Sequence, residues 1–323
     1  MSRPQRGASR PVRVRGLRIG HATAPDASTG VTVALFHPPA AVVVDIRGGA
    51  SCTYDTASLS VEATFGRRWA LFFAGGSIHG LDAGRGIRTA LLSGGAGDRP
   101  FRNPNRVVQI SGATLFDLSA VEGPITDYLP LGFDAVAHAS SARVEVGRVG
   151  AGAGAMVGKY LGRERAMPGG IGYSAGRLEE FGSTGALVAL NSVGAVRDAR
   201  SGRWVAGARG PSGRVVPPGF SGRDEGLARE VPRGTNLVLV VTEVPLDRRG
   251  LYRLAQQAHD GIARAVVPAH TATDGDVVFA ATTATDARPH REFYPGWTAD
   301  RVGSHAAELV ARAAVVAVRP RSR

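Results

Sequence analysis

Short apolar runs recur along the chain, and each is closed by a glycine, a proline or a polar residue. Their length and their content of β-branched residues predict buried strands rather than helices. The predicted strands lie at residues 31–36, 41–46, 70–74, 107–110, 142–149, 186–190, 237–244 and 277–283.

Three segments instead place apolar residues at helical spacing. The first runs from 82 to 92, and the last from about 298 to 318. The clearest lies between them: Asp247 can act as its N-cap, its apolar stripe runs from Leu251 to Val266, and Pro268 ends it. Strands and helices therefore mix along the whole sequence.

Many of these elements are apolar on more than one side, which indicates layers buried between other layers. An α/β (α+β) fold with four helix–sheet–sheet–helix layers fits this pattern as well as a doubly wound sheet does. We expect one domain over residues 17–318. Residues 201–234 are rich in Gly, Pro and Arg without periodicity, and predict an exposed, flexible connector.

The composition is that of a soluble globular protein, with 43% hydrophobic and 20% charged residues in 323. No apolar run reaches membrane-spanning length. Cys52 is the only cysteine, so an intrachain disulfide is impossible and a reducing, cytoplasmic compartment is expected. Residues 1–16 carry five arginines without the apolar stretch of a secretory signal, and predict a disordered tail.

The formal net charge of +12 does not indicate a nucleic-acid-binding protein. Residues 1–16 and 319–323 together hold eight arginines and no acid, so about +4 remains on the body of the chain. Aromatic residues that could stack on bases make up only 6%. We therefore expect neither a nucleic-acid partner nor a membrane partner.

The basic residues are 38 arginines and a single lysine, Lys159. Lysine is a compact ammonium whose pKa can fall on burial, whereas arginine remains a charged fork. Lys159 follows the glycine-rich run 149–158, which meets neither the dinucleotide nor the phosphate-loop pattern in full. We expect close backbone packing there, amides free to hold an oxyanion, no cofactor, and a functional cation at Lys159.

Thr235 begins the predicted strand at 237–244, directly after Gly234. Its hydroxyl would need a base, and cleavage of the Gly234–Thr235 bond would supply one as the new α-amine. Asp274 and Asp276, two residues apart before a predicted strand, could orient such a nucleophile. A strand-starting threonine and a polar turn are the alternatives that need no function.

The amide of Asn191, at the end of an apolar run, could donate to a developing oxyanion. His21, His79 and His270 are too scattered in the sequence to predict a metal site.

These segments, in this order and spacing, resemble the self-processing N-terminal-nucleophile hydrolases of the β-aminopeptidase and L-aminopeptidase/D-esterase family, which includes the nylon-oligomer hydrolases. The resemblance covers almost the whole chain apart from its ends. It is carried by residues 16–21, 45–49, 74–82, 149–159, 169–172, 191, 234–235 and 270–276.

The resemblance implies a helix–sheet–sheet–helix fold and a tetramer of protomers cleaved into an α chain, 1–234, and a β chain, 235–323. It makes Thr235 the nucleophile, with Lys159, Asn191, Asp274 and Asp276 assisting. His79 stands where the family often has an aromatic residue beside the substrate.

The implied activity is hydrolysis of amide or ester bonds in small peptides or peptide-like oligomers through an acyl-enzyme. The alternatives are an acyl transferase similar to ornithine acetyltransferases, and an uncleaved binding protein without activity.

Overall fold

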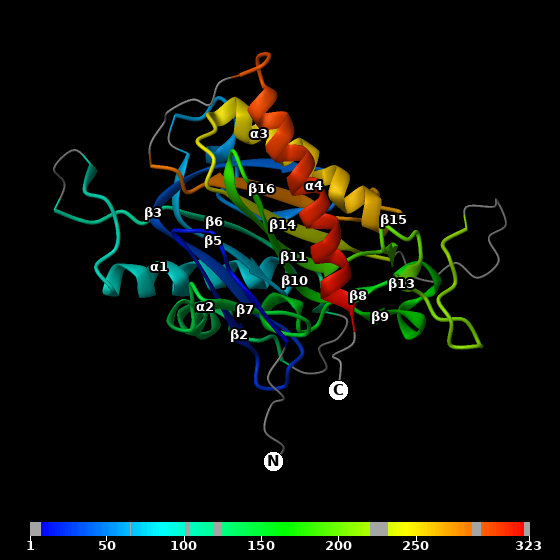
Figure 1. The fold of residues 1–323 in the computed structure, drawn as a ribbon. Coiled ribbons are helices and arrows are strands. Elements are labelled where there is room, and N and C mark those ends of the chain that lie inside the picture. The colour runs from blue at the N-terminus through cyan, green and yellow to red at the C-terminus, as the bar shows by residue number, and fades with distance from the viewer. Residues whose placement is uncertain are drawn as a thin grey trace.

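The structure is a computed structural model that describes residues 8–64, 66–100, 104–118, 124–219, 232–285 and 292–319. Within these residues, nine hydrogen-bonded strands organise the fold (Figure 1). Eight of them form a path in the order β10-β11-β14-β16-β3-β5-β6-β4, and the ninth, β2, pairs with β3 beside this path. These strands are β2 (Leu17–Thr23), β3 (Gly30–Ile46), β4 (Cys52–Tyr54), β5 (Arg67–Ala74), β6 (Ile110–Thr114), β10 (Gly170–Leu178), β11 (Gly182–Asn191), β14 (Thr235–Thr242) and β16 (Val277–Thr282).

The remaining elements cover or edge this sheet path. The helices are α1 (Ala83–Ser93), α2 (Tyr128–Ala137), α3 (Arg248–Ala265) and α4 (Trp297–Val318). The short strands are β1 (Ser9–Pro11), β7 (Arg143–Glu145), β8 (Met156–Val157), β9 (Met167–Pro168), β12 (Ala195–Arg197), β13 (Trp204–Ala206) and β15 (Val266–Val267).

The 17-residue strand β3 divides the path into two layers. Its first part pairs with β2 and β5, and its second part pairs with β16. The register against β5 shifts between Leu35 and Ala40, where the two parts meet. One long strand therefore contributes to both sheets, which is why the sequence shows two apolar runs here while the structure has one strand.

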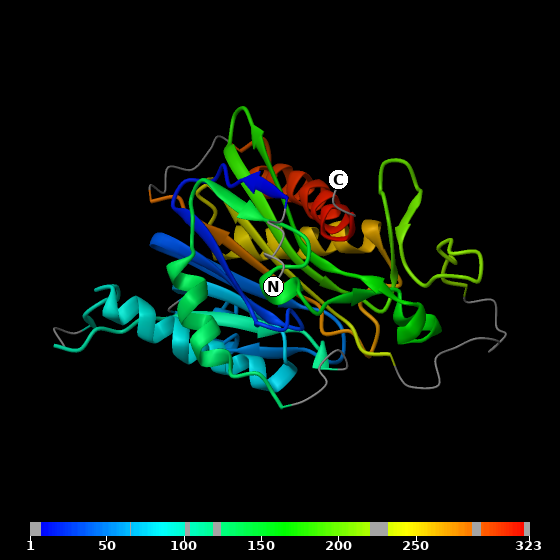
Figure 2. The ribbon, with the colours of Figure 1, turned by 90° about the horizontal axis from the view of Figure 1, so that it is seen from below.

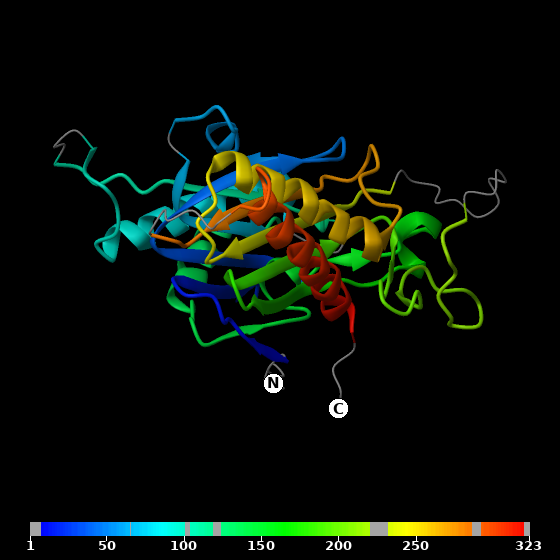
Figure 3. The same ribbon diagram turned by 45° about the horizontal axis from the view of Figure 1, so that its top comes forward.

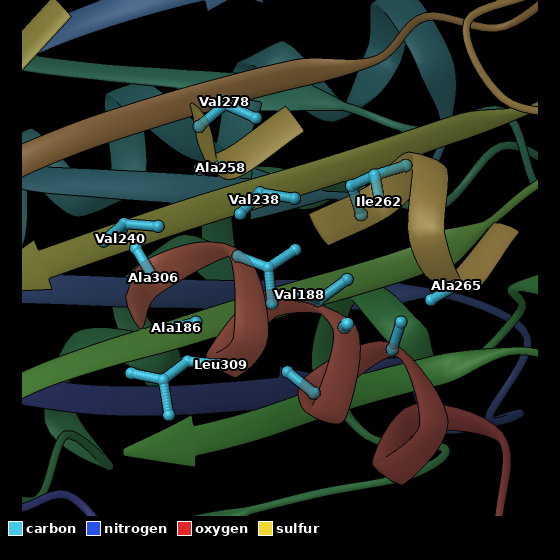
Figure 4. Close-up of a cluster of buried hydrophobic side chains, with 14 of the residues drawn as sticks. Ala186, Val188, Val238, Val240, Ala258, Ile262, Ala265, Val278, Ala306 and Leu309 are labelled. Atoms are coloured by element: carbon cyan, nitrogen blue, oxygen red, sulfur yellow. The ribbon is translucent and has the colours of Figure 1, made fainter. Parts of the chain in front are cut away.

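Three buried clusters separate four layers. One lies between α3, α4 and the strands β11, β14 and β16; Val188, Val238 and Ile262 belong to it (Figure 4). The second fills the space between the two sheets and includes Leu187 and Leu237. The third joins the other sheet to α1 and α2. Seen from below, α1 and α2 lie on one side of the strands and α3 and α4 on the other (Figure 2).

The fold class is therefore the helix–sheet–sheet–helix sandwich expected from the sequence, and the doubly wound alternative is wrong. Side chains alternate along β11 and β14, so that successive residues enter different clusters. Because both faces of these strands are buried, they read in the sequence as continuous apolar runs. Figure 3 shows α3 and α4 lying over the outer face of this sheet.

Three helices, α1, α3 and α4, match their predicted segments closely, whereas α2 was not predicted. Asp247 caps α3 by accepting a hydrogen bond from the amide of Gly250 at 2.7 Å. Two strands differ in position from their predictions. A strand was predicted at 107–110, but β6 begins at Ile110, and the predicted strand at 142–149 contains only the short β7. Glycines around 147–154 turn the chain there instead of continuing a strand.

The predicted tail and connector both hold more structure than expected. Within the tail, β1 pairs with β7, and Val12 and Val14 are buried, so residues 8–16 belong to the fold. Within the connector, β13 pairs with β12, and Ala206 and Ala208 are buried. Alternate apolar residues in short runs anchor both segments although their composition is that of a loop. Residues 1–7 and 220–231 lie outside the described residues.

Candidate active site

Thr235 is the first residue of β14 and only 3% exposed. It pairs across the antiparallel ladder with Asn191, the last residue of β11. Opposite residues in such a ladder project from the same face, so both side chains point into the space between the sheets. The Thr235 hydroxyl donates a hydrogen bond to the carbonyl oxygen of Gly234 at 2.5 Å. A hydroxyl thus lies against the carbonyl group of its own preceding peptide bond.

Gly234 is fixed on both sides by backbone hydrogen bonds. Its amide donates to the Thr273 carbonyl at 3.1 Å, and its carbonyl accepts from the Gly275 amide at 3.0 Å. A Cβ added at Gly234 would lie 2.1 Å from Asp274 Oδ1 and 2.6 Å from the Val193 nitrogen. Only glycine fits this close approach.

The Gly234–Thr235 bond lies at a cavity of about 310 Å³. Small side chains dominate its wall, together with Phe116 and Arg233, whose guanidinium lies 5.1 Å from the centre of the Phe116 ring. The lining residues are Ala50, Cys52, Ser77, Thr114, Phe116, Arg233, Gly234, Thr235, Ala272 and Thr273. A substrate of modest size could therefore reach the hydroxyl of Thr235.

Lys159 is hydrogen-bonded to Asn191, the ladder partner of Thr235. Its side chain is 9% exposed, and Nζ donates to the Asn191 carbonyl at 2.8 Å and to Asn191 Oδ1 at 3.1 Å. Asn191 Oδ1 also accepts from the Met156 amide at 3.0 Å, and Nδ2 donates to the Phe116 carbonyl at 2.9 Å. One of the two Nδ2 hydrogens is thus committed to the cavity wall, which leaves one for an oxyanion.

The glycine run places Lys159 by bringing backbones together, as the sequence suggested. Gly158 has a φ of 77°, and a Cβ there would lie 2.3 Å from the backbone at Gly207 and Ala208. The lysine amide donates to the Val193 carbonyl at 2.9 Å. The close contact is made with the segment that the sequence had assigned to a loose connector.

Burial dominates the electrostatics of the site. It lowers the pKa of Lys159 to about 7, against the opposing influence of the Asp274 and Asp117 carboxylates. It also raises the pKa of Asp274, and the nearby charge of Asp276 adds to that rise. Asp274 Oδ1 accepts from the Val193 amide at 3.4 Å, and Oδ2 accepts from the Thr271 hydroxyl at 2.8 Å. The charged forms of Lys159 and Asp274 therefore stabilise one another.

Asp276 contacts β14 at Asn236, whose side chain projects from the face opposite that of Thr235. Its Oδ1 accepts from both the backbone and the side-chain nitrogens of Asn236, each at 2.8 Å. Its Oδ2 accepts from His270, through the backbone amide at 3.0 Å and through Nδ1 at 2.7 Å. Asp276 therefore contacts the residue after Thr235, and any influence on the hydroxyl passes through the backbone.

Asp117 is a buried carboxylate that the sequence did not single out. It is 2% exposed and accepts from the Gly76 amide at 2.7 Å and the Thr29 hydroxyl at 2.8 Å. Burial raises its pKa. Its neighbour Phe116 lines the cavity. The available signal was an acidic residue directly after Leu115 and Phe116, where a polar strand end is the ordinary explanation.

His79 lies in the 3-10 helix Ser77–Asp82, where it is half-buried. The cavity wall includes Ser77 from this helix rather than His79. Over the described ranges, no three His, Cys, Asp or Glu side chains gather as a metal site would require. In the same part of the chain, no helix is both long and apolar enough to cross a membrane.

Comparison with known proteins places this geometry in a family. The profile of peptidase family S58 matches residues 12–320. An uncharacterized aminopeptidase of Mycobacterium leprae is 33% identical over 94% of this chain and 88% of its own length. A 6-aminohexanoate-oligomer endohydrolase of Agromyces sp. is 31% identical over 83% of this chain and 73% of its own.

Solved structures share the fold at lower identity. The L-aminopeptidase D-Ala-esterase/amidase of Ochrobactrum anthropi, described as a variant of the Ntn hydrolase fold, superposes with a TM-score of 0.68 at 20% identity. That match covers 97% of this chain and 88% of the other. A β-aminopeptidase of Burkholderia sp. has a TM-score of 0.64 at 22% identity, covering 98% of this chain and 88% of the other. On the near-complete family match and these relatives, the chain belongs to peptidase family S58.

Proposed function

We propose that the protein is a self-processing hydrolase of peptide and amide bonds whose nucleophile is Thr235. The observation that carries this proposal is the hydroxyl of Thr235, 2.5 Å from the carbonyl oxygen of Gly234 at the wall of a cavity. Membership of family S58 supports the reaction class. The names of the relatives, aminopeptidases and an oligomer endohydrolase, support amides of small peptides or peptide-like oligomers as substrates.

The first reaction is cleavage of the chain itself. Thr235 Oγ attacks the carbonyl carbon of Gly234, its proton passes to the departing nitrogen, and the C–N bond breaks to leave an ester. The Gly275 amide, which already donates to the Gly234 oxygen at 3.0 Å, would hold the oxyanion. Water then hydrolyses the ester, giving a Gly234 carboxylate, a free Thr235 hydroxyl and a free α-amine.

Turnover of a substrate uses the new amine as the base. The amine accepts the proton of Oγ while Oγ attacks the substrate carbonyl, and it returns that proton to the leaving group. Water hydrolyses the acyl-enzyme in the second half of the cycle. The free hydrogen of Asn191 Nδ2 supports an oxyanion role, and the Lys159 ammonium supports a neutral Thr235 amine through like-charge repulsion.

Intact mass spectrometry of the purified protein tests the proposal. The wild-type chain is expected to give two fragments, 1–234 and 235–323, that remain associated. Thr235→Ala is expected to give one full-length mass and no hydrolysis of an aminoacyl anilide, whereas Thr235→Ser keeps a hydroxyl and should still be cleaved. A full-length wild-type protein that hydrolyses the anilide would disprove the mechanism.

We propose that cleaved protomers associate as a tetramer, as the family resemblance implies, and that the protein acts in the cytoplasm. Light scattering coupled to gel filtration measures the mass of the assembly directly, and a monomer of the cleaved protein would contradict the tetramer.

A further inference from the structure

A cluster of polar side chains lies on the face of β14 opposite the cavity. Asn236 projects there, because it alternates with Thr235 along the strand. Asp276 is 1% exposed and accepts four hydrogen bonds, two from Asn236 and two from His270. Both carboxylate oxygens of Asp276 therefore act as hydrogen-bond acceptors, each for two donors. Asp276 ties the second residue of β14 to the loop before β16.

His270 donates two hydrogen bonds to this carboxylate. Its backbone amide and its ring Nδ1 both reach Asp276 Oδ2, at 3.0 Å and 2.7 Å. Its φ is 58°, a left-handed conformation that costs a histidine about 1 kcal/mol or more. A residue is kept in such a conformation where the surrounding structure requires it, and such positions cluster at functional sites.

The ring of His270 packs against the ring of His259 on α3. The two rings meet edge to face with centroids 4.8 Å apart. His259 Nε2 lies 3.1 Å from the carbonyl oxygen of Asp45 and so carries the hydrogen. Burial lowers the pKa of His259 to about 3, so this ring is neutral and packs as an aromatic residue. The His270 Nε2 atom has no hydrogen-bond partner among the described residues, which leaves Nδ1 as the ring's polar contact.

We infer that His270 is a positioning residue for Thr235. Its Nδ1 donor holds Asp276, Asp276 holds the backbone and side chain of Asn236, and Asn236 fixes the backbone from which the Thr235 hydroxyl projects. The inference rests on the proposed function of Thr235. It assigns a role in the reaction to a histidine that does not line the cavity.

The experiment tests the side-chain donor of His270 separately from the left-handed conformation of its backbone. Asparagine and glycine both tolerate a left-handed backbone, but only asparagine offers a side-chain donor near the position of Nδ1. His270→Asn and His270→Gly are therefore a matched pair. Each is synthesised in a cell-free system beside the wild type and Thr235→Ala, and cleavage is followed by gel over time. The cleaved enzymes are then assayed on an aminoacyl anilide.

We expect His270→Gly to slow both cleavage and kcat by about tenfold to a hundredfold, the range that a misplaced reacting group produces. Its KM should change less than about twofold, since His270 does not line the cavity. His270→Asn should restore both rates to within about threefold of the wild type, because the donor is restored.

The outcomes are distinguishable. An uncleaved wild-type chain overturns the proposed function, and this inference with it. Normal cleavage and kcat in His270→Gly overturn this inference alone. Equal losses in His270→Asn and His270→Gly also overturn it, because the side-chain donor would then be irrelevant. A merely structural role would lower the melting temperature of both variants without the difference in kcat between them.

Discussion

Asn191 and Thr235 face each other across β11 and β14, and the Lys159 ammonium is bonded to the first of them. The next residue along β14, Asn236, projects from the other face and is bonded to Asp276. The strand that carries the proposed nucleophile is therefore held by one set of polar contacts on each face of the sheet. The hydrogen bonds on the two faces involve different residues, so each set can be changed by its own substitutions.

Lys159→Arg is expected to slow cleavage and turnover by about tenfold or more. The Nζ atom reaches two oxygens of Asn191 from a position only 9% exposed, and a guanidinium is larger and spreads its donors over a plane. The substitution keeps the charge, so a loss would report the size and placement of the ammonium. The measurement is the cleavage half-time by gel, followed by kcat of the cleaved enzyme.

Lys159→Met is the matched control for that substitution, because it keeps an unbranched side chain that ends one atom earlier and removes the ammonium group. It should be as slow as Lys159→Arg or slower. Wild-type rates in both variants would show that the lysine serves only as a buried spacer.

The stability of the uncleaved chain should rise with pH because of Lys159. Burial lowers its pKa to about 7 in the folded state, from the ordinary lysine value of 10.5. The unfolded chain therefore binds more protons than the folded chain between pH 7 and pH 10.5. The cost of burying the ammonium is full below pH 7 and disappears as the pH approaches 10.5. Each pH unit in this window is worth about 1.4 kcal/mol at most.

Urea unfolding of Thr235→Ala and of Thr235→Ala/Lys159→Met at pH 7 and pH 9 measures this effect without interference from cleavage. The stability difference in favour of the methionine variant should shrink at pH 9. A difference that does not change with pH would show that the lysine is solvated.

The sequence was sufficient to predict the local part of the site. Gly234 and Thr235 stand next to each other in the chain, and the strand that follows them is strongly apolar, so their position at a strand end could be read directly. Lys159 was found because it is the only lysine. Its pairing with Asn191 depends on a turn at Gly158 and on antiparallel register, and the sequence specifies neither.

The remainder of the site comes from pairings distant in sequence. Phe116 and Asp117 reach it because β6 lies parallel to β5, a pairing that periodicity cannot predict. Asp274 and Asp276 were expected to act together on Thr235, but they bond to different partners. Gly275 lies between them, and a Cβ there would lie 2.6 Å from the carbonyl oxygen of Ala50. This close approach of two backbones depends on the tertiary fold, so the spacing of the two aspartates could not predict it.

Gly234→Ala is expected to abolish or strongly slow cleavage and to destabilise the fold. The added Cβ would overlap Asp274 Oδ1 at 2.1 Å and the Val193 nitrogen at 2.6 Å, and the backbone atom cannot move away cheaply. Overpacking of this kind typically costs about 1–3 kcal/mol. Mass spectrometry measures the cleavage, and urea unfolding in the Thr235→Ala background measures the stability.

Gly94→Ala is the control for that substitution. Gly94 has a φ of −77°, and an added Cβ would be no closer than 3.5 Å to its neighbours. Its stability should stay within about 0.5 kcal/mol of the wild type, with normal cleavage. If Gly234→Ala behaves like Gly94→Ala, the close packing at the cleavage position has no role in the reaction.

Arg233→Ala is expected to raise KM while leaving kcat nearly unchanged. Arg233 and Phe116 form one part of the cavity wall, held by the guanidinium over the ring at 5.1 Å. Cation–π contacts at exposed positions are worth about 0.5–1 kcal/mol, which corresponds to an increase in KM of about two- to fivefold. The hydroxyl of Thr235 and its hydrogen-bond partners do not involve this side chain, so the chemical step should be unaffected.

Arg301→Ala is the matched control, since Arg301 lies 5.4 Å over the ring of Trp297 on α4, and neither residue lines the cavity. Loss of that contact should change neither KM nor kcat. Steady-state kinetics of both variants on one aminoacyl anilide, after cleavage has been verified by mass, gives the comparison. Equal KM values for Arg233→Ala and the wild type would mean that substrates do not contact this wall, and a fall in kcat alone would place Arg233 in the chemical step instead.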